Sequence, residues 1–171
     1  HVPHRRQRQM CIRDRLPPGV ERHVVNAGGL TGLQIFPDDE IEIINDEGNQ
    51  ICEIICFDKD GKSELAILNL KENSDKSFIK EILKKKDESS LATNFQLKKR
   101  NLDLNKSHSS ILFDEKTPSG EKIKLKSKDK CYVIFSAPQN DMLVSEQNPS
   151  GDLILFIKRA KITNDLSLIH I

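Results

Sequence analysis

The sequence contains no tryptophan and a single tyrosine, and aromatic residues make up only 5% of its 171 residues. Nucleic-acid-binding surfaces that stack bases need more aromatic side chains than this, so nucleic-acid binding is disfavoured. A continuous apolar run of about 18 residues is also absent, which excludes a membrane-spanning helix at the sequence level. Hydrophobic residues nevertheless make up 36% of the chain and charged residues 31%, a balance that can bury the core of one domain.

The net charge of +1 is unevenly distributed. Residues 1–15 carry five of the eight arginines against one aspartate, and the rest of the chain is net acidic by three. MCIRDR (residues 10–15) and LSLIHI (residues 166–171) resemble translated sequencing adapter at the ends of a metagenomic fragment. We therefore expect non-native, disordered tails over 1–15 and 165–171, and a single β-rich domain over 16–164. A basic arm that binds nucleic acid or lipid is the alternative for the first tail.

Cysteine is scarce as well, with four residues in the chain. Cys11 lies in the first predicted tail, which leaves Cys52, Cys56 and Cys131 without the spacing of a disulfide framework. Reduced thiols and a cytoplasmic protein are therefore expected.

Short segments with alternating or continuous apolar residues, separated by turns, predict a mainly β (α+β) fold. We expect a small β-barrel or sandwich of about eight to ten strands with one or two inserted helices. In residues 40–44 the alternation places Ile41 and Ile43 inward, and the almost wholly apolar segment 50–57 predicts a strand buried on both faces. The predicted strands are 30–36, 40–44, 50–57, 64–68, 109–114, 122–125, 131–136 and 153–158, with a further short strand at 142–144.

Turns and helices complete the prediction. Residues 45–49 and 58–61 are expected to close hairpins, and 16–26 to be an irregular entry to the domain. The spacing of apolar residues in 74–86 predicts an amphipathic helix with Ser74 as its N-cap, and 89–100 predicts a second helix.

No residues form a recognisable catalytic triad or phosphate-binding loop, so no catalytic residue is assigned. Cys52 and Cys56, four residues apart on one strand, would lie on one face about 13 Å apart, too far to bind one zinc ion together. Two small buried apolar side chains are the plainer interpretation. A metal site that combines Cys52 or Cys56 with His108 and Cys131 is the alternative, because these residues come from different segments. Otherwise His108 is a solvated loop histidine.

Two polar loops at the ends of apolar strands are the candidate ligand-binding regions. The first contains Asn49 and Gln50, and the second, over residues 136–152, contains Gln147 and Asn148. Side-chain amides can hold a polar ligand without charge, so these four residues are the predicted ligand-binding residues. The alternative is that each amide hydrogen-bonds the backbone of its own loop.

Two long stretches together resemble the urea-carboxylase-associated domain family. They are AGGLTGLQIFPDDEIEIINDEGNQICEIICFDKDGKSELAIL, followed by SAPQNDMLVSEQNPSGDLILFIKR. The chain is most similar to the version that precedes glycine-cleavage T-protein-like aminomethyltransferase domains in marine bacteria. The motifs are a DDEIEIINDEGNQ strand–turn–strand and an SAP…M…QNP loop, and neither is a catalytic signature.

The resemblance implies a β-rich accessory domain in the one-carbon metabolism of methylated amines, not catalytic alone. The implied partner is a downstream T-protein-like domain in the parent chain, and tetrahydrofolate would be the cofactor of that parent rather than of this segment. A small polar ligand is a further expected partner. The alternative implied by stand-alone family members is a metal-assisted, deiminase-like subunit that works with urea or guanidine carboxylation. A His/Cys ligand set like theirs is not matched here.

Overall fold

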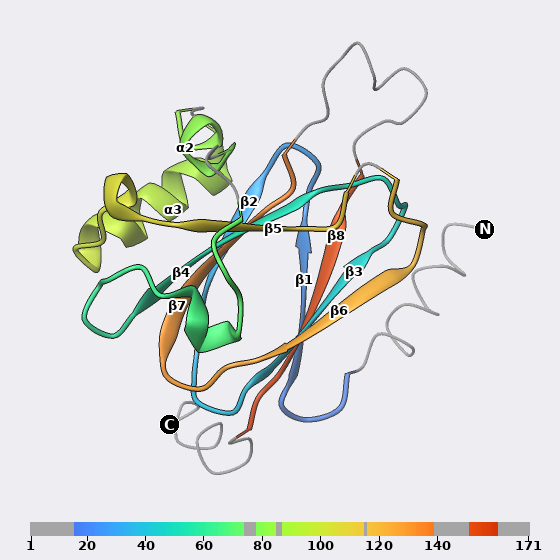
Figure 1. The fold of residues 1–171 in the computed structure, drawn as a ribbon, viewed down its shortest axis with the longest axis horizontal. Coiled ribbons are helices and arrows are strands. Elements are labelled where there is room, and N and C mark those ends of the chain that lie inside the picture. The colour runs from blue at the N-terminus through green and yellow to red at the C-terminus, as the bar shows by residue number, and fades with distance from the viewer. Residues whose placement is uncertain (1–15, 74–77, 85–86, 115, 139–150, 161–171) are drawn as a thin grey trace, which may run out of the picture.

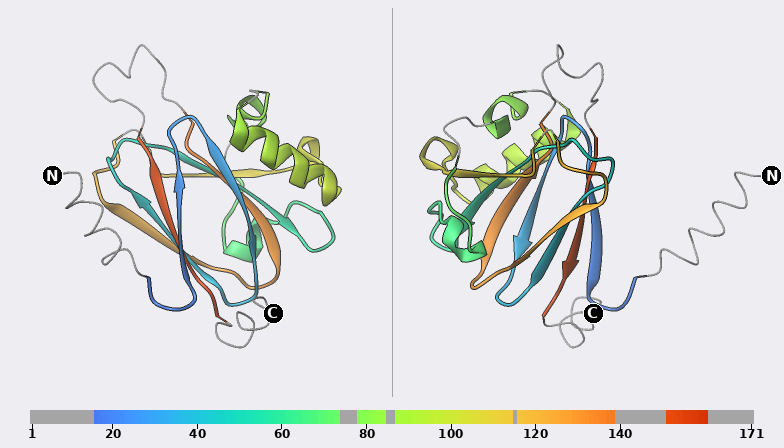
Figure 2. Two further views of the ribbon diagram at one scale, coloured as in Figure 1. Left: turned by 180° about the vertical axis from the view of Figure 1, so that it is seen from behind. Right: turned by 45° about the vertical axis from the view of Figure 1, so that its right-hand side comes forward.

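The protein folds as a sandwich of two four-stranded antiparallel sheets, with two helices on the outer side of one sheet (Figure 1). The computed structural model describes residues 16–73, 78–84, 87–114, 116–138 and 151–160. Figure 2 shows from two further directions that both helices lie on the same side of the molecule. None of the helices in the described ranges is long and apolar enough to cross a membrane.

The elements follow one another in the order β–β–β–β–helices–β–β–β–β. The strands are β1 (Val20–Val25), β2 (Leu30–Ile35), β3 (Glu40–Asn45), β4 (Cys52–Asp58), β5 (Ser109–Leu112), β6 (Glu121–Lys126), β7 (Cys131–Ser136) and β8 (Leu153–Lys158). Between β4 and β5 lie the 3₁₀ turn η1 (Leu65–Leu68), α2 (Phe78–Ile82), α3 (Glu88–Lys99) and the 3₁₀ turn η2 (Leu104–Lys106).

Strands close in sequence belong to different sheets. The first sheet has the order β1-β8-β3-β6 and the second the order β2-β7-β4-β5, with every pair antiparallel. Consecutive strands such as β3 and β4 therefore cross from one sheet to the other, and the core forms between the sheets. The fully buried Ile41 and Ile43 of β3 face Cys52, Ile54 and Cys56 of β4 across this core.

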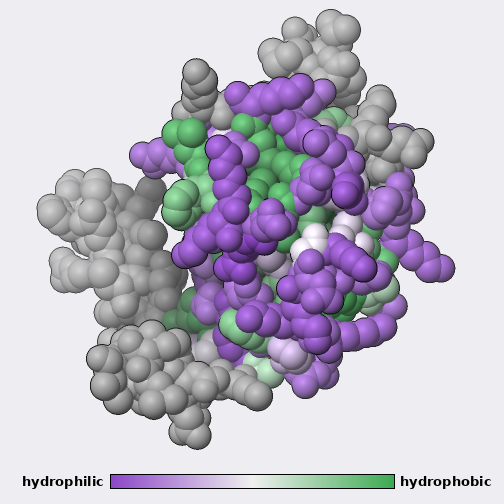
Figure 3. Space-filling view, turned by 90° about the vertical axis from the view of Figure 1, so that its left-hand side faces the viewer, coloured by the Kyte–Doolittle hydropathy of each residue, from purple (hydrophilic) through white to green (hydrophobic). Residues whose placement is uncertain are grey.

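The second sheet is buried on both faces. Alternate residues of β4, such as Ile55 and Phe57, point away from the inter-sheet core and pack with Ile79 of α2 and Leu97 of α3. This explains why β4 is apolar at almost every position. On the other side of α3, the Phe95 side chain is 63% exposed. The space-filling view of the helix-bearing side of the molecule shows hydrophobic residues among hydrophilic ones (Figure 3).

Most of the predicted elements are confirmed, and eight strands agree with the predicted number. The two sheets form a sandwich, so the barrel alternative is wrong. The predicted strand at 64–68 is wrong, because Leu65–Leu68 turns into a 3₁₀ helix with the Glu64 carboxylate bonded to the backbone N–H of Ala66. The irregular entry predicted for 16–26 contains β1 instead, and residues 45–49 connect two sheets rather than close a hairpin.

Several predictions fall outside the described residues. They are the N-cap role of Ser74 and the short strand at 142–144, and the predicted tails over 1–15 and 165–171 lie outside as well. The second predicted helix is confirmed as α3, whose N-cap is Asp87: its carboxylate accepts a hydrogen bond from the Ser90 N–H.

Candidate functional site

Gln50 lies at one end of the sandwich, where the β3–β4 loop meets two backbone segments distant in sequence. Its side chain is fully buried. Nε2 donates hydrogen bonds to the carbonyl oxygens of Ile51 at 2.9 Å and Pro138 at 2.7 Å, and Oε1 accepts one from the Gly151 N–H at 2.9 Å. The amide thus ties together Pro138 and Gly151, 88 and 101 residues away in sequence. Both N–H donors of this amide and one of the two acceptor positions of its oxygen are therefore used within the fold.

Neighbouring loop residues reinforce the same end of the sandwich. The backbone N–H of Gly28 donates to the Ala137 carbonyl at 2.6 Å, and the Ala137 N–H donates to the Gly29 carbonyl at 3.0 Å. The Asp152 carboxylate accepts a hydrogen bond from the Ala27 N–H at 2.9 Å. The turn at residues 27–29 is therefore hydrogen-bonded to both flanks of the second polar loop.

Asn45, the last residue of β3, is a second buried amide at this end. Its Nδ2 donates to the Gln50 carbonyl at 2.7 Å, whereas Oδ1 is a buried acceptor without a hydrogen-bond partner among the described atoms. A buried acceptor without a hydrogen bond costs free energy, so Asn45 offsets part of the stabilisation that the Gln50 hydrogen bonds provide. In the sequence, Asn45 resembles an ordinary turn residue, and nothing near it signals a buried amide.

The four predicted ligand-binding residues have different outcomes. Gln50 bonds the backbone of its own loop at Ile51, but its other two partners, Pro138 and Gly151, belong to the second polar loop. Asn49 adopts a left-handed backbone conformation with φ 60°, and its N–H donates to the Thr117 carbonyl at 2.8 Å. Gln147 and Asn148 lie outside the described residues. A ligand-binding role for these amides stays a prediction.

The three described cysteines are buried and reduced. Cys56 on β4 and Cys131 on β7 form a hydrogen-bonded pair inside the core, and the Ser127 hydroxyl lies 3.5 Å from the Cys131 sulfur. The hydrogen bond to Cys131, together with burial, raises the pKa of the Cys56 thiol, while the same bond lowers the pKa of Cys131. Burial also raises the pKa of Cys52. Cys52 and Cys56, whose thiol pKa values are raised, are therefore poor nucleophiles.

His108 stands apart from these thiols. It is exposed, its Nδ1 lies 2.6 Å from a Glu72 carboxylate oxygen, and its backbone N–H donates to the Ser63 hydroxyl. Within the described part of the chain, no group of three or more His, Cys, Asp or Glu side chains could hold a metal ion. The alternative ligand set of Cys52, His108 and Cys131 is therefore not brought together there, and His108 occupies the loop position that the solvated interpretation predicts.

The most buried charged cluster joins the ends of β1, β3 and β8. The Arg159 guanidinium contacts both Glu21 carboxylate oxygens at 2.8 and 3.1 Å and Asp39 Oδ2 at 2.8 Å. Asp39 is 1% exposed and also accepts hydrogen bonds from the N–H groups of Phe36 and Ala160. Arg159 lowers the pKa of Glu21 through its direct hydrogen bond. With all three charges paired, this cluster holds the sheet end together rather than offering a free acid or base.

A polar hollow of about 280 Å³ lies beside Tyr132 at the other side of the second sheet. The Arg100 guanidinium stacks 4.6 Å above the Tyr132 ring and donates to Gln34 Oε1 at 2.5 Å. Burial raises the pKa of the Tyr132 phenol, and Arg100 opposes this shift. The Tyr132 hydroxyl lies over Gly32, where an added Cβ would meet it at 2.0 Å. A side chain at position 32 would therefore force the Tyr132 ring to move, which favours glycine here.

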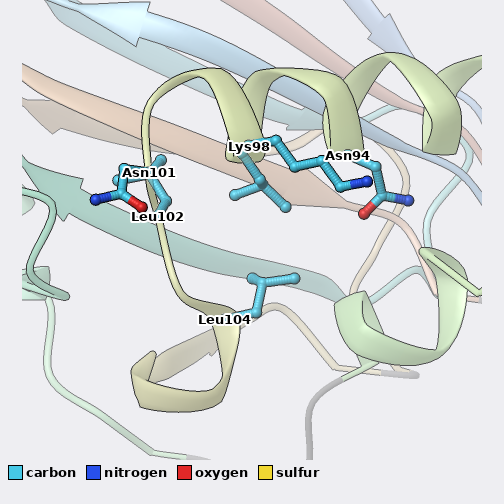
Figure 4. Close-up of a pocket in the computed structure, with 6 residues that line it drawn as sticks. Asn94, Lys98, Asn101, Leu102 and Leu104 are labelled. Carbon is cyan, nitrogen blue, oxygen red and sulfur yellow. The ribbon is translucent and has the colours of Figure 1, made fainter.

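A second hollow of about 390 Å³ lies between α3 and the connector that follows it. Figure 4 shows Asn94 and Lys98 on the helix, with Leu104 on the connector across from them. Asn94 is already engaged, because its Nδ2 donates to the Leu83 carbonyl at 3.1 Å. The remaining lining is mainly leucine, so this hollow lacks the convergent polar groups of a typical small-molecule site.

The chain is similar in sequence to part of a known enzyme and similar in fold to a solved structure. No family model matches the sequence. Over 145 residues the chain is 32% identical to the trimethylamine-oxide aldolase of Ruegeria pomeroyi strain DSS-3, an alignment that covers 85% of this chain and 18% of the relative. The chain therefore spans less than a fifth of that relative's length.

A crystal structure of a DUF1989-family protein from Silicibacter pomeroyi DSS-3 has a similar fold. The TM-score is 0.50 with 11% sequence identity, and the superposition covers 86% of each chain. At this identity the likeness concerns the fold alone. The described sandwich is thus a DUF1989-type fold, and the sequence is related to a segment of an enzyme named for a methylated amine oxide. The association with urea carboxylase stays a prediction.

Proposed function

We propose that this chain is an accessory β-sandwich domain of a larger protein of methylated-amine metabolism, and that it is not catalytic alone. The observation that carries the proposal is the similarity to trimethylamine-oxide aldolase, which extends over most of this chain but a small part of the relative. On this proposal, trimethylamine oxide or a related methylated amine is the substrate of the whole protein.

The remainder of the parent protein would supply the chemistry. The family resemblance favours a T-protein-like aminomethyltransferase domain as that partner, with tetrahydrofolate as its one-carbon acceptor. The sandwich would then present its loop end, held by Gln50, to the partner domain or to a small polar ligand.

The buried carboxylates and the buried thiol of Cys52 support an accessory role, because they are committed to the fold. The buried Glu53 carboxylate accepts hydrogen bonds from the N–H groups of Phe78 and Ile79 at the start of α2. Asp39 is neutralised by Arg159, and Cys52 is fully buried. A general acid or base has to reach its substrate, and these groups are occupied by backbone or by an opposite charge.

A segment exchange tests the proposal. The matching 145-residue segment of the Ruegeria pomeroyi enzyme is replaced by this chain, and trimethylamine oxide consumption is followed by proton NMR. The chimera is expected to consume trimethylamine oxide, whereas deletion of the segment is expected to abolish consumption. The isolated chain, assayed with and without tetrahydrofolate, is expected to leave trimethylamine oxide unchanged.

Two results would contradict the proposal separately. Consumption of trimethylamine oxide by the isolated chain would overturn the accessory role. A chimera that sediments and melts as a folded protein but is inactive would overturn the assignment to this metabolism.

A further inference from the structure

The strand β6 forms one edge of its sheet, with β3 as its only strand neighbour in the described structure (Figure 1). Its backbone therefore has one bonded side and one open side. The direction of each amide follows from bonds just beyond the strand. The Ser127 N–H donates to the Asp39 carbonyl on the β3 side, whereas the Lys128 N–H donates to the Ile67 carbonyl of η1 on the opposite side.

Backbone groups alternate in direction along an antiparallel strand. Odd-numbered residues of β6 thus bond β3, and the even-numbered Lys122, Lys124 and Lys126 direct their N–H and C=O groups to the open side. The Arg159 N–H, which donates to the Gly19 carbonyl, fixes the same alternation independently through β8 and β3. Within the described residues, three positions of β6 consequently offer backbone donors and acceptors without a strand partner over about 13 Å.

All three of these residues are lysines. Their side chains share the outer face of the sheet and are exposed, and Lys124 forms an ion pair with Glu42 at 3.8 Å. Lys128 continues the exposed basic series beyond the strand. The open edge is therefore a column of positive charge along a row of free backbone groups.

On the inner face of the same edge, the apolar side chains of Ile123 and Leu125 are only partly buried, and each lies beside a hollow whose other lining is mostly polar. Ile123 lies beside a hollow of about 340 Å³ that Phe113 also lines, and Leu125 lies beside one of about 400 Å³ that Leu68 also lines. Ile123 and Leu125 are two residues apart, about 7 Å along the strand, so side chains from an added strand could enter both hollows.

The bonded side of β6 shows which strand its side chains match. Along β3, Glu40 is opposite Lys126 and Glu42 opposite Lys124, whereas Ile41 and Ile43 point into the core. A sequence of alternating acidic and apolar residues therefore fits the side chains of β6 on both faces of the sheet. Its open side repeats these requirements, with lysines on the outer face and two hollows on the inner face.

We propose that the open edge of β6 binds an extended acidic segment of a partner protein by strand addition. The segment alternates acidic residues, which face Lys122, Lys124 and Lys126, with apolar residues, which enter the hollows beside Ile123 and Leu125. Main-chain hydrogen bonds supply affinity, and the alternate side chains supply specificity. The lysines also repel basic strands, so the edge is selective as well as protected from unspecific pairing.

A peptide with the sequence of residues 38–45, DDEIEIIN, is the direct probe of this edge. Binding of the fluorescently labelled peptide to the full chain is measured by fluorescence anisotropy at low and at high salt. We expect saturable binding that weakens with salt, and at least about tenfold weaker binding to the Lys124→Glu variant. A peptide with both glutamates replaced by lysine is expected not to bind.

Two further variants separate the backbone contribution from net charge. Lys124→Pro removes an N–H that the fold leaves unbonded, so the protein should keep its melting temperature within a few degrees and lose at least about tenfold in affinity. Lys106→Glu makes the same charge change at an exposed position of η2 and should alter the affinity less than about twofold. Absence of binding up to about 1 mM peptide, equal binding of the lysine-substituted peptide, or equal loss in Lys106→Glu would each overturn the proposal.

Discussion

Replacing Gln50 by alanine should destabilise the protein strongly, although Gln50 is a polar residue next to a turn. Its side chain is fully buried and makes three hydrogen bonds, to Ile51, Pro138 and Gly151. Alanine removes all three bonds at once. Pro138 and Gly151 are themselves buried, so the carbonyl of one and the N–H of the other lose their partner away from water.

The magnitude follows from the number of bonds and the burial of the groups left behind. Each hydrogen bond contributes about 1 kcal/mol net, and each buried backbone group without a partner costs a further 1–3 kcal/mol, roughly. Partial entry of water reduces the sum, so we expect a loss of about 4 kcal/mol in the free energy of unfolding. For a domain of this size that corresponds to a melting temperature lower by about 10 °C.

Urea denaturation followed by circular dichroism measures the loss directly. Gln96→Ala is the matched control, because the Gln96 amide makes one exposed hydrogen bond, from Arg100 Nε at 3.3 Å, and should cost less than about 0.5 kcal/mol. Gln50→Glu sharpens the test. It turns a donor toward two carbonyl oxygens into an acceptor, and its destabilisation should increase with pH as the buried carboxyl ionises.

A loss below about 1 kcal/mol in Gln50→Ala, or no difference from Gln96→Ala, would refute the reasoning. The amide would then not hold the two backbone segments together, and ligand binding would be the favoured role of Gln50. A large loss would show that the hydrogen bonds of this amide stabilise the fold.

Three further outcomes follow from the structure. Gly32→Ala should cost about 1–3 kcal/mol in urea denaturation because its Cβ meets the Tyr132 hydroxyl, and adding Tyr132→Phe should recover part of that loss. Arg159 lowers the folded-state pKa of Glu21, so this pair stabilises the protein above the ordinary carboxyl pKa and stops doing so as the pH falls. The free energy of unfolding should therefore decline less between pH 6 and pH 3 in Arg159→Met than in the unaltered protein. Burial raises the pKa of Cys52, so iodoacetamide at pH 8 should modify it slowly in the native state and rapidly in urea, as peptide mass spectrometry would show; equal rates would contradict its burial.

Much of the fold could be predicted from the sequence because side-chain alternation is a local signal. Ile41 and Ile43 mark the inner face of β3, and the continuous apolar run of β4 marks a strand covered on both sides. The strand β1 was not predicted, because the charged residues of VERHVV fall on both faces of the strand and hide any alternation. Its pairing partner β8 is also more than 120 residues away in sequence. Leu65–Leu68 is apolar enough for a strand, yet the Glu64 cap and a left-handed Asn69 turn it into a 3₁₀ helix.

The assignment of strands to sheets is not a local property. Residues 45–49 contain the glycine and asparagine of a hairpin turn, and φ is 82° at Gly48 and 60° at Asn49. Those angles reverse the chain but do not decide whether the next strand pairs with β3 or crosses the core. Non-local pairing decided it, since β3 bonds β6 and β8 while β4 bonds β5 and β7.

The same separation of local signal from distant partner explains why a loop amide is ambiguous in sequence. Gln50 was predicted as a ligand-binding residue because an amide at the end of an apolar strand can hold a polar group. It does hold polar groups, but they are the carbonyl of Pro138 and the N–H of Gly151, supplied by the chain itself. These partners within the chain could not be predicted from the sequence, because they depend on which strands are neighbours, and a ligand-binding role for Gln50 stays a prediction. The edge of β6 presents the converse case: its neighbour on one side is known, and the lysines, the backbone amides and the hollows beside Ile123 and Leu125 on the other side indicate the chemistry of the partner proposed above.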